Sequence, residues 1–409
     1  MVKKTLLLVT NYYPYFHGEE YLETEILYLS ESYSEIIIIP TMNSSKMEIT
    51  RKLPENCVVL DVNYNLTKIK KINFLTKKVY LDDLMLSKAN SFIKKLYLKY
   101  FEVRSLYIFK VICNSDLLSK ISNTDVDIYS YWFYVTARVS ILLKELLIGN
   151  GKCIDNLVSR AHRYDLYENE SRLNYLPERE FLLSNLDTVF PCSEDGKMHI
   201  ISNYPSFASK VKTSYLGTIS GKRINESKSP ENIIVSCSGL RKVKQINILI
   251  DALEILDKQG FNFKWIHFGD GPEKKKLVGL ASSKINKEKF IFRGSIKNQD
   301  LQDWYDSNNV DLFVNVSRSE GIPVSIMEIM SRGIPVLVTD AGGSGELIDK
   351  NGVLLETNPA PEKVANNIRY ILSSKTYNEM CSNSYSEWNK KFNANKNYTA
   401  FVDELLKIK

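Results

Sequence analysis

Residues 310–346 read VDLFVNVSRSEGIPVSIMEIMSRGIPVLVTDAGGSGE and place a helix-period pattern between two short, β-branched apolar runs. The first run predicts a strand over 310–316 and the second a strand over 334–339. A loop and a short helix lie between them, and a Gly-rich turn follows. A strand, a helix and a strand in this order form a right-handed crossover in a parallel sheet. The stretch therefore predicts an α/β fold.

The same alternation runs through the chain in two series. The first series of predicted strands covers 6–10, 36–40, 58–62, 127–132, 157–161 and 188–192, and the second covers 233–237, 264–268, 290–293, 310–316 and 334–339. A polar stretch, 217–231, separates them. The pattern predicts two doubly wound, Rossmann-like domains with parallel sheets, over 1–220 and 221–381, and a C-terminal helix over about 382–409.

The composition is that of a globular protein. A chain of 409 residues exceeds what one hydrophobic core usually serves, and 44% hydrophobic with 25% charged residues excludes collagen-like and disordered classes. The apolar run at 6–9 is too short for a membrane span or a signal peptide. We expect it to be the first strand of a cytoplasmic protein.

The six cysteines and four histidines are scattered along the chain. No cysteine pair has the spacing of a metal knuckle or a redox motif, and the histidines lack zinc-ligand spacing. We expect free, buried thiols in a reducing compartment, and no protein-bound metal.

Positive charge is concentrated in residues 66–110, which hold eleven Lys or Arg and three acids among many aromatic and aliphatic residues. This mixture is typical of amphipathic helices at an anionic membrane surface. A solvated helical face is an equally good interpretation. Nucleic-acid binding is disfavoured because no nucleic-acid motif accompanies the charge.

Two glutamates of the 310–346 stretch are candidates for binding a substrate. Glu320 lies in the loop after the first strand, and Glu328 lies in the helix that follows. Pro323 suits the first turn of that helix. A helix N-terminus suits a diphosphate, and its backbone amides would be those of Gly321, Ile322 and Val324. Carboxylates beside a diphosphate suit sugar or ribose hydroxyls, although two solvated glutamates remain an alternative.

This stretch resembles the E-x7-E motif of retaining family-4 glycosyltransferases. The matching positions are Glu320, Gly321, Pro323, Glu328, Met330, Gly333, Pro335, Val336, Gly342, Gly343 and Glu346. The resemblance implies that Glu320 contacts the donor-sugar hydroxyls and that Glu328 binds the nucleotide ribose. It also implies that the backbone amides after Glu320 hold the diphosphate.

Two basic residues lie where the predicted strand 233–237 is followed by a helix. Arg241 and Lys244 follow Gly239, and the family has a Gly-Arg turn with a Lys-Gly pair there, whereas Gln245 follows Lys244 in this chain. The resemblance implies that both bases neutralise the leaving nucleoside diphosphate. Surface bases on a helix cap are the alternative. The resemblance also implies that three glycines line the nucleotide: Gly269, Gly271 and Gly294.

In the first domain, the resemblance rests on two stretches that follow strands. The loop 11–20 has Gly18 as its single glycine, where the family often has two for a phosphate or acceptor contact. SRAHRYD at 159–165 resembles the family's His-Gly-x-Asp stretch, with Arg163 in place of the glycine. His162 is implied as a contact to the donor sugar or the reaction centre. Both stretches resemble bacterial capsular, O-antigen and exopolysaccharide members.

The resemblance implies a GT-B fold, with two facing domains, a cleft between them and a C-terminal helix that returns to the first domain. It implies retaining, metal-independent transfer of a hexose-type sugar from a UDP-sugar, favoured over a GDP-sugar, to a glycan acceptor. No cofactor is expected. A lipid-linked acceptor would place the protein peripherally on the inner face of the cytoplasmic membrane through residues 66–110. The alternatives are a hydrolytic or non-catalytic nucleotide-sugar-binding protein of the same fold, or an epimerase.

Overall fold

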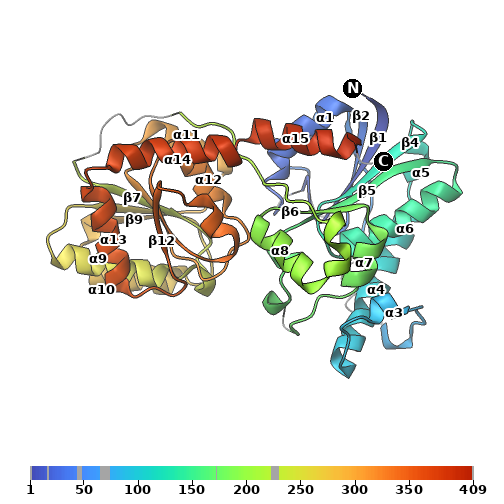
Figure 1. The fold of residues 1–409 in the computed structure, drawn as a ribbon, viewed down its shortest axis with the longest axis horizontal. Helices are drawn as coiled ribbons and strands as arrows, with labels where there is room; N and C mark the ends of the chain where they lie inside the picture. The colour runs from blue at the N-terminus through green and yellow to red at the C-terminus, as the bar shows by residue number, and fades with distance from the viewer. Residues whose placement is uncertain are drawn as a thin grey trace. The chain divides into compact units, whose positions relative to one another are not determined.

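The chain folds into two compact units (Figure 1). The computed structural model describes residues 2–15, 18–43, 48–64, 74–171, 173–222 and 230–407. The first unit comprises 1–214 with 398–409, and the second comprises 215–397, so the chain divides slightly before the predicted position near 220. Parts of two predicted features, 66–73 of the basic segment and 223–229 of the polar stretch, lie outside the described residues.

The first unit contains a six-stranded parallel sheet in the order β3-β2-β1-β4-β5-β6. Its strands are β1 (Val2–Thr10), β2 (Tyr33–Pro40), β3 (Cys57–Val59), β4 (Asp125–Ser130), β5 (Cys153–Ala161) and β6 (Thr188–Pro191). Its α-helices are α1 (Leu22–Ser32), α3 (Asp83–Leu86), α4 (Phe92–Cys113), α5 (Leu117–Lys120), α6 (Val135–Gly149), α7 (Arg179–Asn185) and α8 (Glu194–Asn203). Its 3-10 helices are η1 (Phe74–Thr76), η2 (Arg163–Asp165), η3 (Glu168–Glu170) and η4 (Pro205–Lys210).

The second unit has a six-stranded parallel sheet in the order β12-β11-β10-β7-β8-β9. Its strands are β7 (Ile233–Cys237), β8 (Lys264–Phe268), β9 (Phe290–Gly294), β10 (Leu312–Asn315), β11 (Val336–Thr339) and β12 (Gly352–Leu355). Its α-helices are α9 (Ile246–Lys258), α10 (Lys274–Lys284), α11 (Asn298–Ser307), α12 (Val324–Met330), α13 (Pro361–Ser373) and α14 (Tyr377–Lys391). Its 3-10 helices are η5 (Lys242–Lys244), η6 (Lys287–Lys289) and η7 (Gly342–Leu347), and a last helix, α15 (Ala394–Lys407), leads into the first unit.

Each sheet is covered on both faces, as β1 illustrates. Leu7 and Val9 join an apolar cluster with α4 and α6, whereas Leu6 and Leu8 join another cluster with α1 and the end of the chain. All four side chains are fully buried. A strand buried on both faces has a continuous apolar sequence, which explains why these strands were recognisable from short apolar runs.

The predicted doubly wound α/β architecture is confirmed, with two differences in its elements. The eleven predicted strands are present, but β12 was missed because it is a partly exposed edge strand without a continuous apolar run. The stretch predicted as one C-terminal helix contains the end of α14 and then α15. Thr218 interrupts the helix, because its N–H donates to Phe392 O at 2.9 Å and its carbonyl accepts from Ala394 N at 3.0 Å.

The expectation that all six thiols are buried is wrong, although all six cysteines are free. Cys192 and Cys381 are buried, whereas Cys113 and Cys153 are exposed. The exposed pair lies at the ends of elements, since Cys113 is the last residue of α4 and Cys153 the first of β5. An apolar neighbourhood in sequence does not bury a residue at the end of an element.

The helix α4 is the longest in the described part of the chain, with 22 residues. Ser91 caps its N-terminus by accepting the N–H of Lys94, and its buried face includes Leu98, Phe101 and Ile108. Over the described ranges, no helix has both the length and the apolar composition required of a membrane span.

Candidate functional site

The second sheet changes its direction of winding between β7 and β10. The chain passes from β7 outward through β8 to β9, then returns to β10 beside β7 and continues outward to β12. Ligands of such sheets bind beyond the carboxyl ends of the strands at this point, because the loops there diverge. Lys244 follows β7, and Glu320 follows β10.

Lys244 and Glu320 form an ion pair at this point. Lys244 Nζ lies 2.6 Å from Glu320 Oε1, and Asn315 Nδ2 donates to the same oxygen at 3.3 Å. The two loops are also joined by backbone, because Arg318 N donates to Val243 O at 2.8 Å. The pair is only partly buried, with 22% of the lysine side chain and 11% of the glutamate exposed. The sequence placed both residues at the site but did not show that they would contact each other.

Glu328 lies nearby on α12 and is buried. Asn298 Nδ2 donates to Glu328 Oε1 at 2.8 Å. Burial raises the pKa of this carboxyl, and the Asn298 hydrogen bond opposes the rise. The thiol of Cys237, at the end of β7, lies within electrostatic range of both Glu328 and Lys244. Burial and then the charge of Glu328 raise the pKa of this thiol to about 12, whereas the charge of Lys244 lowers it. Lys244 and Glu328 therefore both lie near the carboxyl end of β7.

The predicted glycines of the nucleotide side bring three turns into backbone contact. Gly269 has φ +135° and donates its N–H to Gly294 O at 2.8 Å. A Cβ on Gly269 would lie 1.9 Å from Ser238 O, and one on Gly271 would lie 2.5 Å from Leu240 O. Only glycine fits at these two positions. At Gly239 there is room for a side chain, because a Cβ there would lie 3.7 Å from its nearest neighbour, Asp270 O.

The loop from Glu320 to Val324 rests on the Gly-Gly turn after β11. Gly343 N donates to Gly321 O at 2.7 Å, and a Cβ on Gly342 would lie 2.2 Å from Glu320 O. The predicted position of Pro323 in the first turn is wrong by one residue, because it precedes α12 with extended ψ 106° and Val324 opens the helix. The side chains of Ile322, Pro323 and Val324 are buried, so this segment offers a ligand mainly its backbone.

Arg241 stands apart from this arrangement. It is exposed, and its side chain forms no hydrogen bond or ion pair with any residue that the structure describes. The structure therefore brings together Lys244, Glu320 and Glu328, while the predicted role of Arg241 stays a prediction.

In the first unit, His162 follows β5 and is buried between two aromatic rings. Its ring centroid lies 4.8 Å from those of both Tyr131 and Trp132. Burial, reinforced by the charge of Arg160, lowers its pKa to about 3, so the imidazole is neutral at physiological pH. Its Nε2 has no hydrogen-bond partner among the described residues. The predicted His162 is thus a neutral polar group at the carboxyl edge of the first sheet.

Sequence reasoning missed Glu19, which fastens the loops after β1 and β4. Its carboxylate accepts backbone N–H groups from Asn11 at 2.7 Å, Tyr12 at 2.7 Å and Tyr13 at 2.6 Å, and Nε1 of Trp132 at 2.6 Å. The predicted Gly18 precedes it and is exposed, with φ +70° and no atom near the position of a Cβ. The sequence shows an acid in a loop that lacks the family's second glycine, but it does not show that this acid is buried.

A cavity of about 540 Å³ also lies in the first unit. Three tyrosines line it: Tyr97 from α4, Tyr134 after β4 and Tyr164 after β5. Glu170 and leucines complete the wall. Aromatic faces with nearby polar groups suit a ligand that has both apolar faces and hydroxyl groups.

Comparison with protein families identifies the part of the chain that holds the Lys244–Glu320 pair. Residues 220–388 match the family model described as Glycosyl transferases group 1. The second unit carries a glycosyl transferase group 1 domain. The motif-based resemblance to glycosyltransferases is confirmed for this domain, and the retaining family-4 subclass stays a prediction.

A curated protein that is similar to this chain aligns with part of it. WcaL of Escherichia coli, named provisionally as a colanic acid biosynthesis glycosyltransferase, is 27% identical over 246 residues, which cover 57% of this chain and 59% of WcaL. The chain thus aligns with less than two thirds of this relative.

Among solved structures, sucrose-phosphate synthase from Thermosynechococcus elongatus superposes with a TM-score of 0.73 at 15% identity, covering 99% of this chain and 98% of its own. HepE of Anabaena, in complex with UDP and glucose, superposes with a TM-score of 0.64 at 17% identity, and the alignment covers 99% of each chain. The predicted GT-B fold class is confirmed by these similarities.

Proposed function

We propose that this chain is a glycosyltransferase that moves a hexose-type sugar from a UDP- or GDP-sugar to a glycan acceptor in bacterial surface polysaccharide assembly. The observation that carries the proposal is the Lys244–Glu320 ion pair at the switch point of a group 1 domain. The names of WcaL and of the Anabaena complex with UDP and glucose support the acceptor class and a UDP-sugar donor.

In the proposed reaction, Lys244 and Glu320 exchange their mutual contact for contacts with the donor. The ammonium group neutralises charge that develops on the departing nucleoside diphosphate, and the carboxylate accepts hydrogen bonds from hydroxyls of the sugar. Glu328 accepts a hydrogen bond from a ribose hydroxyl. The ion pair positions both side chains before the donor arrives, which reduces the reorganisation that binding requires.

We propose retention of anomeric configuration without a metal ion. Lys244, Arg241 and the backbone amides of Gly321, Ile322 and Val324 supply positive charge and hydrogen-bond donors for the leaving diphosphate. Glu320 is assigned to the sugar hydroxyls and not to the reacting carbon, so the proposal includes no covalent intermediate of the kind formed by retaining glycosidases. The acceptor oxygen therefore attacks from the side on which the diphosphate departs, and its proton passes to a phosphate oxygen of that leaving group.

The acceptor is assigned to the first unit. The tyrosine-lined cavity at the carboxyl ends of β4 and β5 supports this assignment, because sugar rings stack on aromatic faces. We propose that the acceptor glycan is lipid-linked and that the protein works in the cytoplasm at the inner face of the membrane.

The donor site is tested by thermal shift with a panel of nucleotides and nucleotide sugars. A ligand at a hundred times its dissociation constant adds roughly 2.7 kcal/mol of stability, which is readily measured. We expect UDP or GDP to stabilise the protein, and Lys244→Ala and Glu328→Ala to abolish the shift. Lys242→Ala is the matched control, because Lys242 is an exposed lysine in the same 3-10 helix η5.

The acceptor reaction separates a transferase from its alternatives. A transferase forms a glycoside when donor and glycan acceptor are both present, and Lys244→Ala lowers kcat by about 10² to 10³, as for loss of one group that stabilises developing negative charge. Release of free sugar without use of an acceptor would indicate a hydrolase. Nucleotide binding without turnover would indicate a non-catalytic protein, and absence of any nucleotide-induced shift would overturn the donor site.

A further inference from the structure

A surface of the first unit combines strong exposure of apolar side chains with positive charge. Tyr80 and Phe92 are 81% and 75% exposed, the two highest values among large hydrophobic residues of the described chain. Leu75, Leu84 and Ile93 are also exposed, at 55%, 40% and 61%. These five residues lie within nineteen consecutive residues, 75–93, and form a local concentration that a monomeric protein rarely leaves in water without a partner.

The positive charge of the same region is not neutralised by acids in the part of the chain that the structure describes. Residues 74–110 hold eight Lys or Arg and three acids. Two of the acids already have other partners: Asp82 caps α3 by accepting the N–H of Met85, and Glu102 pairs with buried Arg138 at 2.8 Å. None of the eight bases forms an ion pair with an acid of the described residues, whereas in the second unit Lys284 pairs with two acids at 2.7–2.8 Å.

The basic and apolar groups share one face of α4. Phe92, Lys95, Lys99, Val103, Leu106 and Lys110 succeed one another at intervals of three or four residues, which places them along one side of a helix. The segment that precedes α3 lies against this face, since Lys99 Nζ donates to Leu75 O at 2.7 Å and Phe74 packs on Tyr100 with ring centroids 5.6 Å apart.

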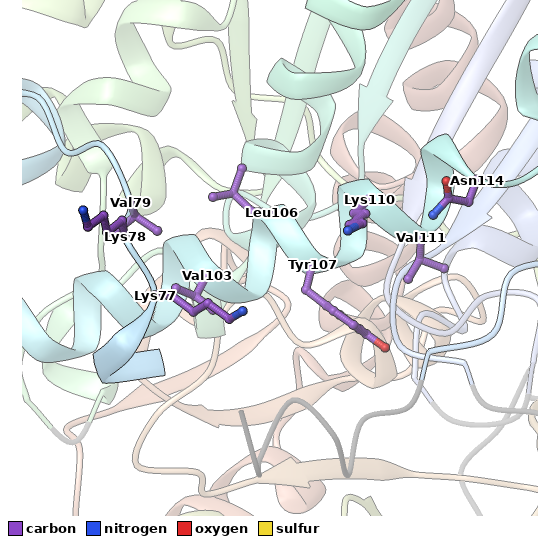
Figure 2. Close-up of a pocket in the computed structure, with 9 residues that line it drawn as sticks. All are labelled: Lys77, Lys78, Val79, Val103, Leu106, Tyr107, Lys110, Val111 and Asn114. Atoms are coloured by element: carbon purple, nitrogen blue, oxygen red, sulfur yellow. The ribbon is translucent and has the colours of Figure 1, made fainter. Parts of the chain in front are cut away.

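A pocket of about 500 Å³ opens between that segment and the C-terminal half of α4 (Figure 2). Its walls are largely apolar, with Val79 from the segment and Val103, Leu106 and Val111 from the helix. Lys77, Lys78 and Lys110 also line it, and each of these lysines is exposed. The pocket therefore offers an apolar interior together with three cationic groups.

We propose that this basic-apolar surface, formed by residues 74–95 and the outer face of α4, docks on a bilayer that contains anionic phospholipid. Lysines 77, 78 and 110 bind the lipid phosphates, an acyl chain enters the pocket, and Tyr80, Phe92 and Ile93 insert between headgroups. Charge complementarity identifies this occupant, because the unneutralised cations require an anionic partner and the adjoining apolar groups require hydrocarbon. The inference extends the proposed function, since it supplies the membrane surface on which a lipid-linked acceptor is presented.

The test is sedimentation of the full-length protein with vesicles of phosphatidylcholine alone or with one quarter phosphatidylglycerol. We expect binding to the anionic vesicles that weakens when salt rises from 50 to 500 mM, because salt screens exposed charges. The variant Lys77→Glu/Lys78→Glu/Lys110→Glu should bind roughly a hundredfold more weakly, because each lysine near an anionic surface contributes about a fivefold factor.

A matched variant controls for overall charge. Lys275→Glu/Lys287→Glu/Lys375→Glu makes the same change of charge at three exposed lysines of the second unit and should bind like the unaltered protein. Phe92→Ser/Ile93→Ser should remove the part of the binding that survives at 500 mM salt. Unchanged thermal midpoints and nucleotide-induced shifts would show that these variants fold and retain the donor site, independently of the result of vesicle sedimentation.

Three results would overturn the proposal: equal binding to both kinds of vesicle, binding to neither kind, and equal loss of binding in both triple variants. The nucleotide-induced shift is measured separately, so failure of this inference is distinguishable from failure of the proposed function.

Discussion

At the scale of single residues, the role proposed for Glu328 in ribose binding conflicts with the stability of the fold. Its carboxylate is buried beside Asn298 and Cys237, and burial raises its pKa. A carboxyl with a raised folded-state pKa contributes fully to stability below its unfolded pKa of about 4.3, and this contribution is lost as pH rises through the folded value. Ionisation of Glu328 therefore lowers the stability of the folded protein.

We therefore expect Glu328→Gln to raise the thermal midpoint at pH 7.5 by a few degrees, since about 1 kcal/mol shifts a domain of this size by roughly 2–4 °C. The gain should shrink towards pH 5, and the nucleotide-induced shift should disappear. Thermal unfolding across this pH range measures both effects. Exposed Glu362 on α13 provides the control, because its change to Gln should alter stability by less than about 0.5 kcal/mol. A lower midpoint for Glu328→Gln at every pH would contradict this account.

At the scale of elements, Glu19 joins the loops that follow two neighbouring strands, β1 and β4. Each of its carboxylate oxygens accepts two N–H groups, so the loop after β1 and Trp132 after β4 share one acceptor. Trp132 in turn packs against His162, with ring centroids 4.8 Å apart. The position of His162 therefore depends on a residue in a loop far away in sequence.

The change Glu19→Gln should destabilise the first unit by about 2 kcal/mol or more. The NH₂ group of the glutamine cannot accept hydrogen bonds, so buried N–H groups would lose their acceptor, and each unsatisfied group costs about 1–3 kcal/mol. Urea unfolding followed by tryptophan fluorescence measures the loss. Glu20→Gln, at the exposed neighbouring acid, is the control. Equal stability of the two variants would show that the four hydrogen bonds do not hold the loop.

At the scale of the whole molecule, the end of the chain belongs to the first unit. Phe401, Val402 and Leu405 of α15 are buried in a cluster with Leu6 and Leu8 of β1. The guanidinium of Arg160, which is paired with Glu25, lies 4.3 Å from the centroid of the Phe401 ring. The first unit therefore includes residues of α15, which are far in sequence from the rest of that unit.

We expect Phe401→Ala to destabilise the first unit by about 3–5 kcal/mol, the usual range for removing a buried phenylalanine. Hydrogen exchange followed by mass spectrometry resolves the two units: peptides of β4 and β5 should lose protection, whereas those of β7 and β10 should not. Asp403→Ala, at an exposed position on the same helix, should change neither. Equal loss of protection in both units would contradict the assignment of α15 to the first one.

Local sequence was sufficient to predict the two sheets and the donor motif. Strands such as β1 and β7 are short apolar runs because both faces of the sheet are covered, and turns such as the one at Gly269 need glycine for steric reasons. The E-x7-E motif is likewise local, because it spans one loop and one short helix. Such features depend on residues close together in the chain, so a pattern reveals them.

Features that depend on distant residues became visible only in the folded chain. The pairing of Lys244 with Glu320 joins positions 76 residues apart, and Thr218 interrupts the final helices through contacts with Phe392 and Ala394. The exposure of Phe92 and the burial of Glu19 also follow from what packs against them. Secondary structure follows from local periodicity, whereas ion pairs, helix breaks and exposed surfaces depend on contacts that only tertiary packing creates.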